Sequence, residues 1–323
     1  MKFLLAFLVA LSAPAAAAPV LVAGDIRPAT DLSGPWHWSV DPYRDGVAGF
    51  HGEEPGLGHR RYADLDVEAE SAKNPNSLFE FDMARSPLAI LPSSWITHSP
   101  QMRYYDGLVW YQRSFDAQPR PHRRYFLRFG AADYRADVFL NGKPLGAHEG
   151  GFTPFAFEAT GLLRPGANQV TVGVDSQRSA ATVPPTVTDW ETYGGLTRPV
   201  RLIELPTTYV DDAWIRLAQD GHIRATVKLD GPAAAGTQVR VRIAGLAVTL
   251  SGRTGADGSW TGEAPAPAAL KRWSPESPAL YDVTVEAGED RLVDRIGFRT
   301  IAVRGRDLLL NGKPIFLRGI SLH

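Results

Sequence analysis

The side chains that most often carry chemistry in enzymes are either absent from this sequence or scattered along it. There is no cysteine, which excludes disulfides, thiolate nucleophiles and thiolate metal sites. The 8 histidines are dispersed, and His51 and His59, with Glu53 and Glu54 between them, fit a solvated Gly-rich loop better than a metal site. Neither a Gly-x-Ser-x-Gly elbow nor a phosphate-binding Gly loop occurs. The residues alone therefore predict no metal, no cofactor and no nucleophilic triad.

The best side chains for ligand recognition are the 8 tryptophans. In a β-sandwich most tryptophans fill the core, whereas an indole near a loop can stack on the C–H face of a sugar ring. We therefore expect most of the tryptophans to be buried in the core, and one or two could stack on a sugar.

Composition and charge narrow the class of protein. The 323 residues are 44% hydrophobic and 21% charged, with a formal net charge of −1. This is an ordinary globular composition, and it gives no electrostatic reason to expect nucleic acid or a membrane as partner.

Residues 1–18 have the pattern of a secretory signal peptide, with Lys2, an apolar run over 3–11 and a tract of small residues. An uncleaved anchor is the alternative. We expect an exported protein, periplasmic or extracellular.

Short alternating runs bounded by Gly, Pro, Asn and Asp predict many strands and almost no helix. The runs are 109–115, 125–129, 135–140, 169–174, 213–217, 223–229, 239–243, 246–250, 281–285 and 295–301. Asn141-Gly142 predicts a type I′ hairpin, and Asn311-Gly312 predicts another with 307–310 and 315–317 as arms. The chain is therefore predicted to be all-β, with a sandwich or jelly roll before a break near 205–208 and an immunoglobulin-like sandwich after it.

A co-linear set of motifs resembles glycoside hydrolase family 2, which includes β-galactosidases, β-glucuronidases and β-mannosidases. The motifs cover nearly all of the chain after residue 18 and are LSGPW (32–36), LPSSW (91–95), GLVWYQRSF (107–115), ADVFLNG (136–142), GGFTPF (150–155), DWETYGGLTRPV (189–200), WSPESPALY (273–281), IGFR (296–299) and LNGKPIFLRGISLH (310–323). The resemblance implies a jelly-roll sugar-binding domain over 25–205, an immunoglobulin-like β-sandwich over 206–301, and the start of a (β/α)8 barrel over 302–323.

The resemblance also implies two substrate-binding residues. Asp189 lies a few residues before Gly194-Gly195-Leu196, where family members place a carboxylate in the sugar site. A carboxylate suits that role because it accepts hydrogen bonds from adjacent hydroxyls. His323 lies at the end of what resembles the first barrel strand, where the family has a histidine that contacts the sugar. The alternative for Asp189 is a turn cap, and the role of His323 requires a barrel after it.

The family's catalytic pair is not found in the sequence. Its retaining enzymes use two glutamates of later barrel strands, about 5–5.5 Å apart, and an Asn precedes the acid/base. The chain has no Asn-Glu dipeptide, and residues 302–323 are too few for a barrel of about 250 residues. We therefore expect no catalytic residue in this chain.

Two functions follow from these observations. In the first, the chain is the amino-terminal part of an exported retaining glycosidase of β-glucuronidase or β-galactosidase type, interrupted before its barrel and inactive alone. The alternative is a stand-alone carbohydrate-binding protein without catalysis. The ending favours the first, because Ile315, Leu317 and Ile320 would otherwise lack a sheet to pair with. A carbohydrate is the expected partner in both.

Overall fold

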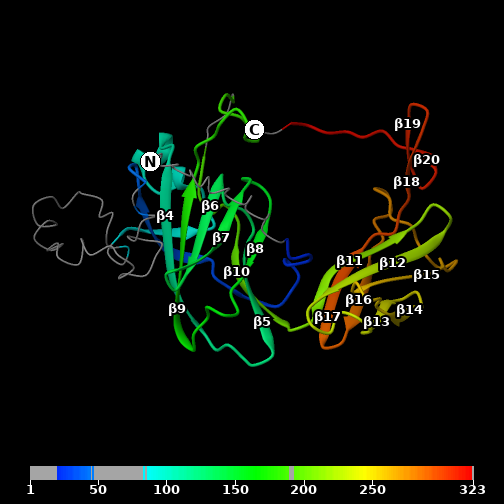
Figure 1. Ribbon diagram of the computed structural model, residues 1–323. Coiled ribbons are helices and arrows are strands. Elements are labelled where there is room, and N and C mark those ends of the chain that lie inside the picture. The colour runs from blue at the N-terminus through cyan, green and yellow to red at the C-terminus, as the bar shows by residue number, and fades with distance from the viewer. Residues whose placement is uncertain (1–19, 45, 47–82, 84–85, 189–192, 322–323) are drawn as a thin grey trace, which may run out of the picture.

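Strands dominate the computed structural model, which describes residues 20–44, 46, 83, 86–188 and 193–321 (Figure 1). The predicted signal peptide over 1–18 and the loop from His51 to His59 lie outside the described residues. Two short 3-10 helices, η3 (Trp95–Thr97) and η4 (Pro100–Tyr104), follow the third strand. Within these described segments, no helix has the length and apolar character needed to cross a bilayer.

The first half of the chain forms a sandwich of two antiparallel sheets. One sheet has the order β1-β10-β5-β8, and the other has the order β3-β2-β4-β9-β6-β7. The strands of the first sheet are β1 (Ala29–Asp31), β10 (Val200–Pro206), β5 (Arg123–Phe129) and β8 (Phe155–Glu158). Those of the second are β3 (Leu88–Leu91), β2 (Gly34–Val40), β4 (Leu108–Ala117), β9 (Gly166–Asp175), β6 (Arg135–Leu140) and β7 (Lys143–Glu149). The chain changes sheet between β5 and β6, β7 and β8, and β9 and β10, as in a jelly roll.

The core of this first sandwich is rich in aromatic side chains. Val109 and Tyr111 of β4 point into the space between the sheets, whereas Trp110 packs on the outer face beside Phe139. Successive side chains of a strand point to opposite faces, which accounts for this division. The buried aromatic residues between the sheets are Trp36, Trp38, Trp95, Tyr111, Tyr125, Phe129, Phe155 and Phe157.

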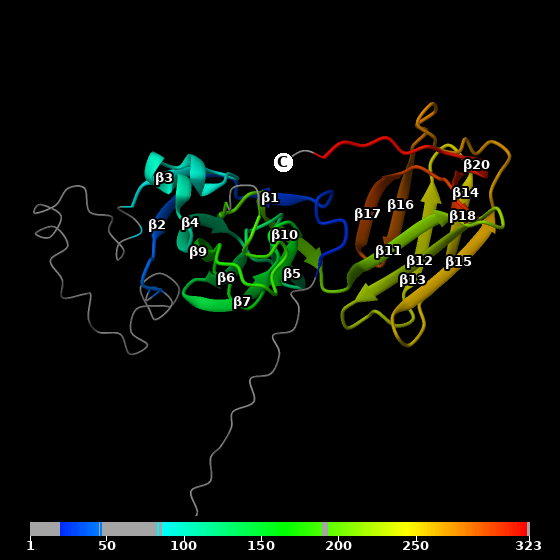
Figure 2. The ribbon, with the colours of Figure 1, turned by 90° about the horizontal axis from the view of Figure 1, so that it is seen from above.

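The second half forms another sandwich beside the first (Figure 2). Its sheets have the orders β11-β12-β15 and β14-β13-β16-β17. The strands are β11 (Tyr209–Leu217), β12 (His222–Asp230), β13 (Gln238–Ile243), β14 (Val248–Arg253), β15 (Ser259–Pro265), β16 (Tyr281–Ala287) and β17 (Asp290–Ile296). The buried core is built from Val, Ile, Leu and Ala, and Phe298 is the single aromatic among its fully buried described members.

Two strand predictions for the second sandwich were wrong. Residues 295–301 are not one strand, because β17 ends at Ile296 and β18 (Ile301–Arg304) begins a separate hairpin. Between them Gly297 packs so closely on Trp273 that a Cβ would lie 2.8 Å from the indole. The strand β15 was not predicted, because its sequence SWTGEAP has a weak apolar pattern and none of its residues is fully buried.

Both Asn-Gly hairpins are present. Asn141 and Gly142 have φ angles of 53° and 74°, which is the type I′ geometry, and they join β6 to β7. The second hairpin joins β19 (Asp307–Leu310) to β20 (Lys313–Pro314). Its predicted second arm over 315–317 was wrong, because only the Ile315 N–H still bonds, to the Leu308 carbonyl at 2.9 Å, and residues 315–321 form no regular element.

A buried ion pair joins the segment before β1 to the second sandwich. The side chains of Arg27 and Asp290 are 2% and 5% exposed, and Nη1 of Arg27 lies 3.2 Å from both Asp290 carboxylate oxygens. Nη2 of Arg27 donates to the Val210 carbonyl at 2.7 Å, while the Val210 N–H donates to Asp290 Oδ2 at 2.8 Å. The pair therefore ties the segment before β1 to β17 and to β11, the first strand of the second sandwich.

Candidate functional site

Three connections meet at one end of the first sandwich, which we call the loop end. They are residues 130–134 between β5 and β6, residues 150–154 between β7 and β8, and residues 176–199 between β9 and β10. Each connection crosses from one sheet to the other, so the strand ends of both sheets face the same region. Loops held by a rigid sheet scaffold are where binding residues are usually found.

Both substrate-binding residues predicted from the sequence lie outside the described residues. Asp189 belongs to the third connection, between the described residues Thr188 and Tyr193, and His323 follows the last described residue, Ser321. Figures 1 and 2 show residues 315–321 running from the second sandwich back toward the first. The assignment of Asp189 and His323 to a sugar site stays a prediction.

A buried carboxylate lies at the centre of the loop end. The side chain of Asp133 is fully buried, and its Oδ1 accepts a hydrogen bond of 2.8 Å from Nη2 of Arg178, which is itself 6% exposed. The guanidinium of Arg178 also lies over the ring of Tyr134, 5.2 Å from its centroid. This pair joins the first connection to the start of the third.

The pair is incompletely satisfied within the described chain. Oδ2 of Asp133 and Nη1 of Arg178 are buried and have no hydrogen-bond partner among the described residues. Burial raises the pKa of Asp133 from 3.8 to about 6, and the positive charge of Arg178 opposes that rise. Because both groups are closed off from solvent, the pair can hold the third connection in position but cannot reach a ligand directly.

Glycines permit the close packing around Asp133. A Cβ on Gly151 would lie 2.4 Å from the Asp133 carboxylate, so the second connection approaches it only because residue 151 has no side chain. Gly195 exchanges two backbone hydrogen bonds with Asp133, of 3.0 and 3.2 Å, at a φ of 121° that favours glycine. Asp133 is therefore in contact with both other connections.

The end of the third connection is fixed against Trp95. The Trp95 N–H donates to the Gly194 carbonyl at 3.0 Å, and a Cβ on Gly194 would lie 2.2 Å from the indole. Trp95 is completely buried, and its indole N–H donates to the Tyr105 carbonyl at 3.3 Å. The segment that carries Asp189 in the sequence is thus anchored before it by Arg178 and after it by Gly194 and Gly195.

A partly buried histidine lies behind this anchor. His98 Nε2 is 3.1 Å from the hydroxyl of Tyr111, and the His98 ring is 5.3 Å from that of Trp38. Burial lowers the pKa of His98 from 6.5 to about 4 and raises the pKa of the Tyr111 hydroxyl. His98 is therefore neutral at physiological pH, and its packing between aromatic rings gives it a structural role.

The described residues contain no group of three or more His, Asp or Glu side chains placed to hold a metal.

Most of the described tryptophans lie in the core or pack against it, and Trp36, Trp38, Trp95 and Trp110 are buried. Trp190 lies outside the described residues. Trp214, on the second sandwich, is 59% exposed and differs from the others in this respect.

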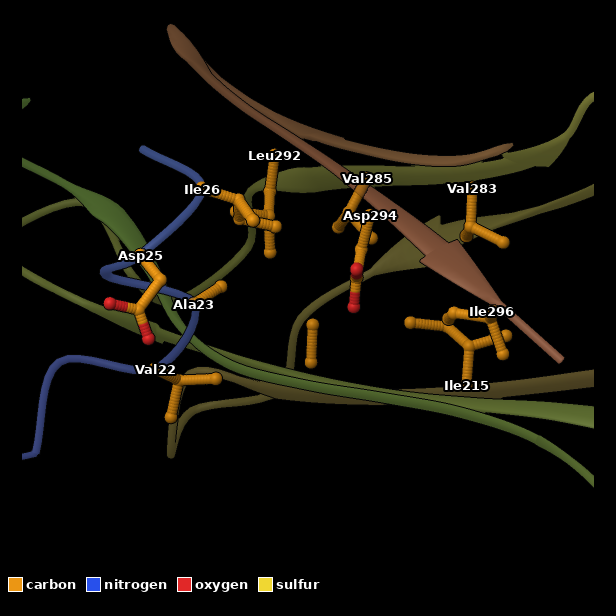
Figure 3. A pocket seen from close by; sticks show the side chains of 11 residues that line it. Val22, Ala23, Asp25, Ile26, Ile215, Val283, Val285, Leu292, Asp294 and Ile296 are labelled. Carbon is orange, nitrogen blue, oxygen red and sulfur yellow. The ribbon is translucent and has the colours of Figure 1, made fainter. Parts of the chain in front are cut away.

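One cavity of about 240 Å³ lies between the segment before β1 and the second sandwich (Figure 3). Aliphatic side chains dominate its lining, and Asp294 points into the space near Val285 and Ile215. The second carboxylate of the lining, Asp25, is paired with Arg128 at 2.9 Å. The lining offers few polar groups for a sugar, so the cavity is a poorer candidate than the loop end.

Sequence reasoning missed Asp133 and Arg178. They are 45 positions apart, and no local pattern connects them. The available signal was the run of small residues before Asp133, at Gly130, Ala131 and Ala132, which leaves room for a buried charge next to a strand.

Comparison with protein families gives two adjoining matches. Residues 30–206 match the model described as glycosyl hydrolases family 2, sugar binding domain, and residues 208–299 match the model described as glycosyl hydrolases family 2. Together they account for both sandwiches.

Individual relatives agree with these matches. The β-glucuronidase of Canis lupus familiaris is 28% identical over 90% of this chain and 52% of its own length. A β-galactosidase of an Arthrobacter species is 32% identical over 61% of this chain and 19% of its own length. Among solved structures, the Bifidobacterium dentium β-glucuronidase complexed with coumarin-3-O-glucuronide superposes with a TM-score of 0.70 at 26% identity, over 93% of this chain and 52% of the other. The chain spans about half the length of the β-glucuronidases it matches.

Proposed function

The chain belongs to glycosyl hydrolase family 2, and from this premise we propose that it is the amino-terminal part of an exported retaining β-glycosidase that acts on β-glucuronides. The proposal of β-glucuronides as substrates rests on one observation. The β-glucuronidase of Canis lupus familiaris matches 90% of the chain in sequence and that of Bifidobacterium dentium matches 93% of it in structure, whereas the β-galactosidase named above matches 61% of it.

In this proposal the first sandwich supplies part of the sugar site. The third connection is held at Arg178 by the buried Asp133 and at Gly194 by the backbone of Trp95. Asp189 lies between these two anchors in the sequence. We propose that the Asp189 carboxylate accepts hydrogen bonds from two neighbouring sugar hydroxyls and orients the ring.

The bond-breaking groups belong to another part of the protein in this proposal. A retaining glycosidase needs an acid/base carboxyl and a nucleophilic carboxylate about 5–5.5 Å apart. We place both in the barrel that the family resemblance predicts after residue 323. The two sandwiches then contribute substrate orientation and support.

The test is to express the complete open reading frame that contains this chain and to assay p-nitrophenyl β-glucuronide, β-galactoside and β-mannoside. We expect turnover of the β-glucuronide, a strong loss of it in the Asp189→Ala variant, and none from residues 1–323 alone. Hydrolysis by residues 1–323, or preference for another glycoside, would contradict the proposal.

One observation favours a second candidate, a carbohydrate-binding protein without catalysis. The family model that matches residues 30–206 is described as a sugar binding domain, and these residues form a sandwich with its own core. A reading frame without a barrel, combined with glucuronide binding by residues 1–323 that Asp189→Ala abolishes, would support this candidate instead.

A further inference from the structure

An open groove on the second sandwich brings together an exposed indole and two arginines. It holds about 500 Å³ and runs between β11 with its following turn, residues 214–219, and the segment 296–301. This volume is within the range of about 300–1,000 Å³ that is usual for small-molecule sites. The groove lies on a different domain from the loop end.

An exposed tryptophan lines the groove. Trp214 is 59% exposed although indole is among the most apolar side chains, and its neighbours Ile215 and Leu217 are buried in the sandwich core. Trp214 therefore does not complete the core of its own domain. An exposed indole beside guanidinium and amide side chains can pack against the C–H face of a sugar ring.

A guanidinium sets the orientation of the indole. The side chain of Arg216, two residues further along β11, lies over the Trp214 ring at 4.3 Å from its centroid. Residues i and i+2 of a strand share a face, so the stacking follows from the strand itself. Arg216 covers one face of the indole, and the exposed fraction of Trp214 shows that much of the remaining ring surface is open.

The groove carries positive charge that no carboxylate balances. Arg216 and Arg299 both line it, and no Asp or Glu is among its described lining residues. Arg299 lies over the Trp273 ring at 5.3 Å and donates to the Gly297 carbonyl at 3.1 Å. Neither guanidinium forms an ion pair with a carboxylate of the described chain, in contrast to the exposed Arg224 nearby, which pairs with Asp220 and Glu263.

A hydrogen bond joins the two walls of the groove. Nε2 of Gln219 donates to the Ile301 carbonyl across it at 2.7 Å. This bond links the turn after β11 to the segment after β17, so the two arginines are presented by a braced frame. A preformed frame lowers the ordering cost of binding.

We propose that this groove is an accessory binding site for an acidic oligosaccharide, with Trp214 stacking on a sugar ring and Arg216 and Arg299 binding uronate carboxylates. The planar guanidinium suits a carboxylate because it can donate two parallel hydrogen bonds. The site requires no catalysis, so its test is independent of the proposed glycosidase activity.

The experiment is calorimetric titration of the purified 323-residue chain with two probes of equal length. Hyaluronan tetrasaccharide carries glucuronate carboxylates, and cellotetraose is neutral. We expect the chain to bind the hyaluronan probe more tightly, with affinity that falls as salt is raised. Trp214→Ala should weaken that binding by about tenfold or more, equivalent to about 1.4 kcal/mol.

A charge variant and a matched control separate the contributions. Arg216→Gln combined with Arg299→Gln should remove the preference for the hyaluronan probe over cellotetraose. Tyr104→Ala removes another exposed aromatic, 83% exposed and also beside an arginine, from outside the groove and should leave binding unchanged.

Three outcomes would overturn the proposal. They are equal affinity of the unaltered chain for the two probes, unchanged binding in Trp214→Ala, and a loss in Tyr104→Ala as large as that in Trp214→Ala. Thermal melting of each variant would confirm that the fold is intact, which the exposure of both aromatic side chains favours.

Discussion

The two sandwiches bury their cores in different ways. The first fills its interior with aromatic rings and also buries charged and polar groups such as Asp41, Arg128 and Asp133. The second fills its interior with branched aliphatic side chains in regular alternation, and β12 shows a buried residue at every second position. Its buried charge, Asp290, lies at the junction with the segment before β1.

The two kinds of core serve different structural purposes. A core of Val and Ile on short strands can form a regular sandwich from the alternation of apolar and polar residues alone. Large rings and buried hydrogen-bonded groups instead fix irregular connections, because each ring or charge has few acceptable surroundings. The first sandwich uses them at the loop end, where Trp95 and Asp133 hold the third connection.

Removing an aromatic ring from the first core should produce the largest difference in stability between the two sandwiches. Trp95→Ala should destabilise the first sandwich by about 3–5 kcal/mol, because it empties the space of a fully buried indole. Hydrogen exchange should show protection lost in β4 and β9 while β12 and β13 keep theirs. The matched change in the second core, Ile223→Ala, should show the reverse pattern. Equal loss in both sandwiches from either variant would mean that they unfold as one unit.

The next largest effect should come from the junction. Arg27→Ala leaves the buried Asp290 carboxylate without its cation and should cost about 3 kcal/mol, at the low end for a broken buried pair because Asp290 keeps the Val210 N–H as donor. Calorimetry should then show the two sandwiches unfolding at more separate temperatures. Replacing both partners, Arg27→Met with Asp290→Leu, should recover part of the loss. A single transition identical to that of the unaltered chain would contradict the assigned role.

A smaller effect concerns pH. Burial raises the pKa of Asp133 to about 6, so between about pH 4 and 6 the folded state holds a proton there that the unfolded state has released. This contribution to stability is complete below pH 4 and is lost as pH rises through 6. The pKa of His98 is lowered to about 4, so His98 acts in the opposite sense and loses its contribution as pH falls from 6.5 to 4.

Variants at the two positions separate these opposing contributions. Asp133→Asn should make the slope of the melting temperature against pH more positive between pH 4 and 6, because the contribution of Asp133 that opposes His98 is removed. His98→Gln should make the same slope more negative. Melting curves at half-unit pH steps provide the measurement, and parallel pH profiles for all three proteins would contradict the assignment.

The smallest effects should come from exposed ion pairs, which do not distinguish the two sandwiches. Arg135 pairs with Asp137 and Glu149 on the first sandwich, and Arg242 pairs with Glu286 on the second. Arg135→Ala and Arg242→Ala should each lower the free energy of unfolding by less than about 1 kcal/mol, and high salt should reduce the difference. A larger loss in denaturant titration would show that one of these pairs is part of a buried network.

Much of the fold was predictable because it follows from local patterns. Alternation located β6 and the run 109–115 within β4, and Asn141-Gly142 identified a hairpin turn. The strand β15 was missed because its half-buried residues give a weak apolar pattern.

The site was less predictable because its contacts join distant residues. Asp133 meets Arg178 only through the packing of three connections, and the groove of Trp214 exists only when residues 296–301 lie beside β11. The family resemblance supplied Asp189 and His323 from sequence alone, and both remain predictions because they lie outside the described residues.

The Arg27–Asp290 pair also has a consequence for the timing of folding during synthesis. Its partners are 263 positions apart, so at about 5–20 residues per second a ribosome needs roughly 13–50 s to make Asp290 after Arg27. Throughout that interval Arg27 has no carboxylate of β17 to bind. The segment before β1 can therefore form its ion pair with the second sandwich only after nearly all of the described chain has been made.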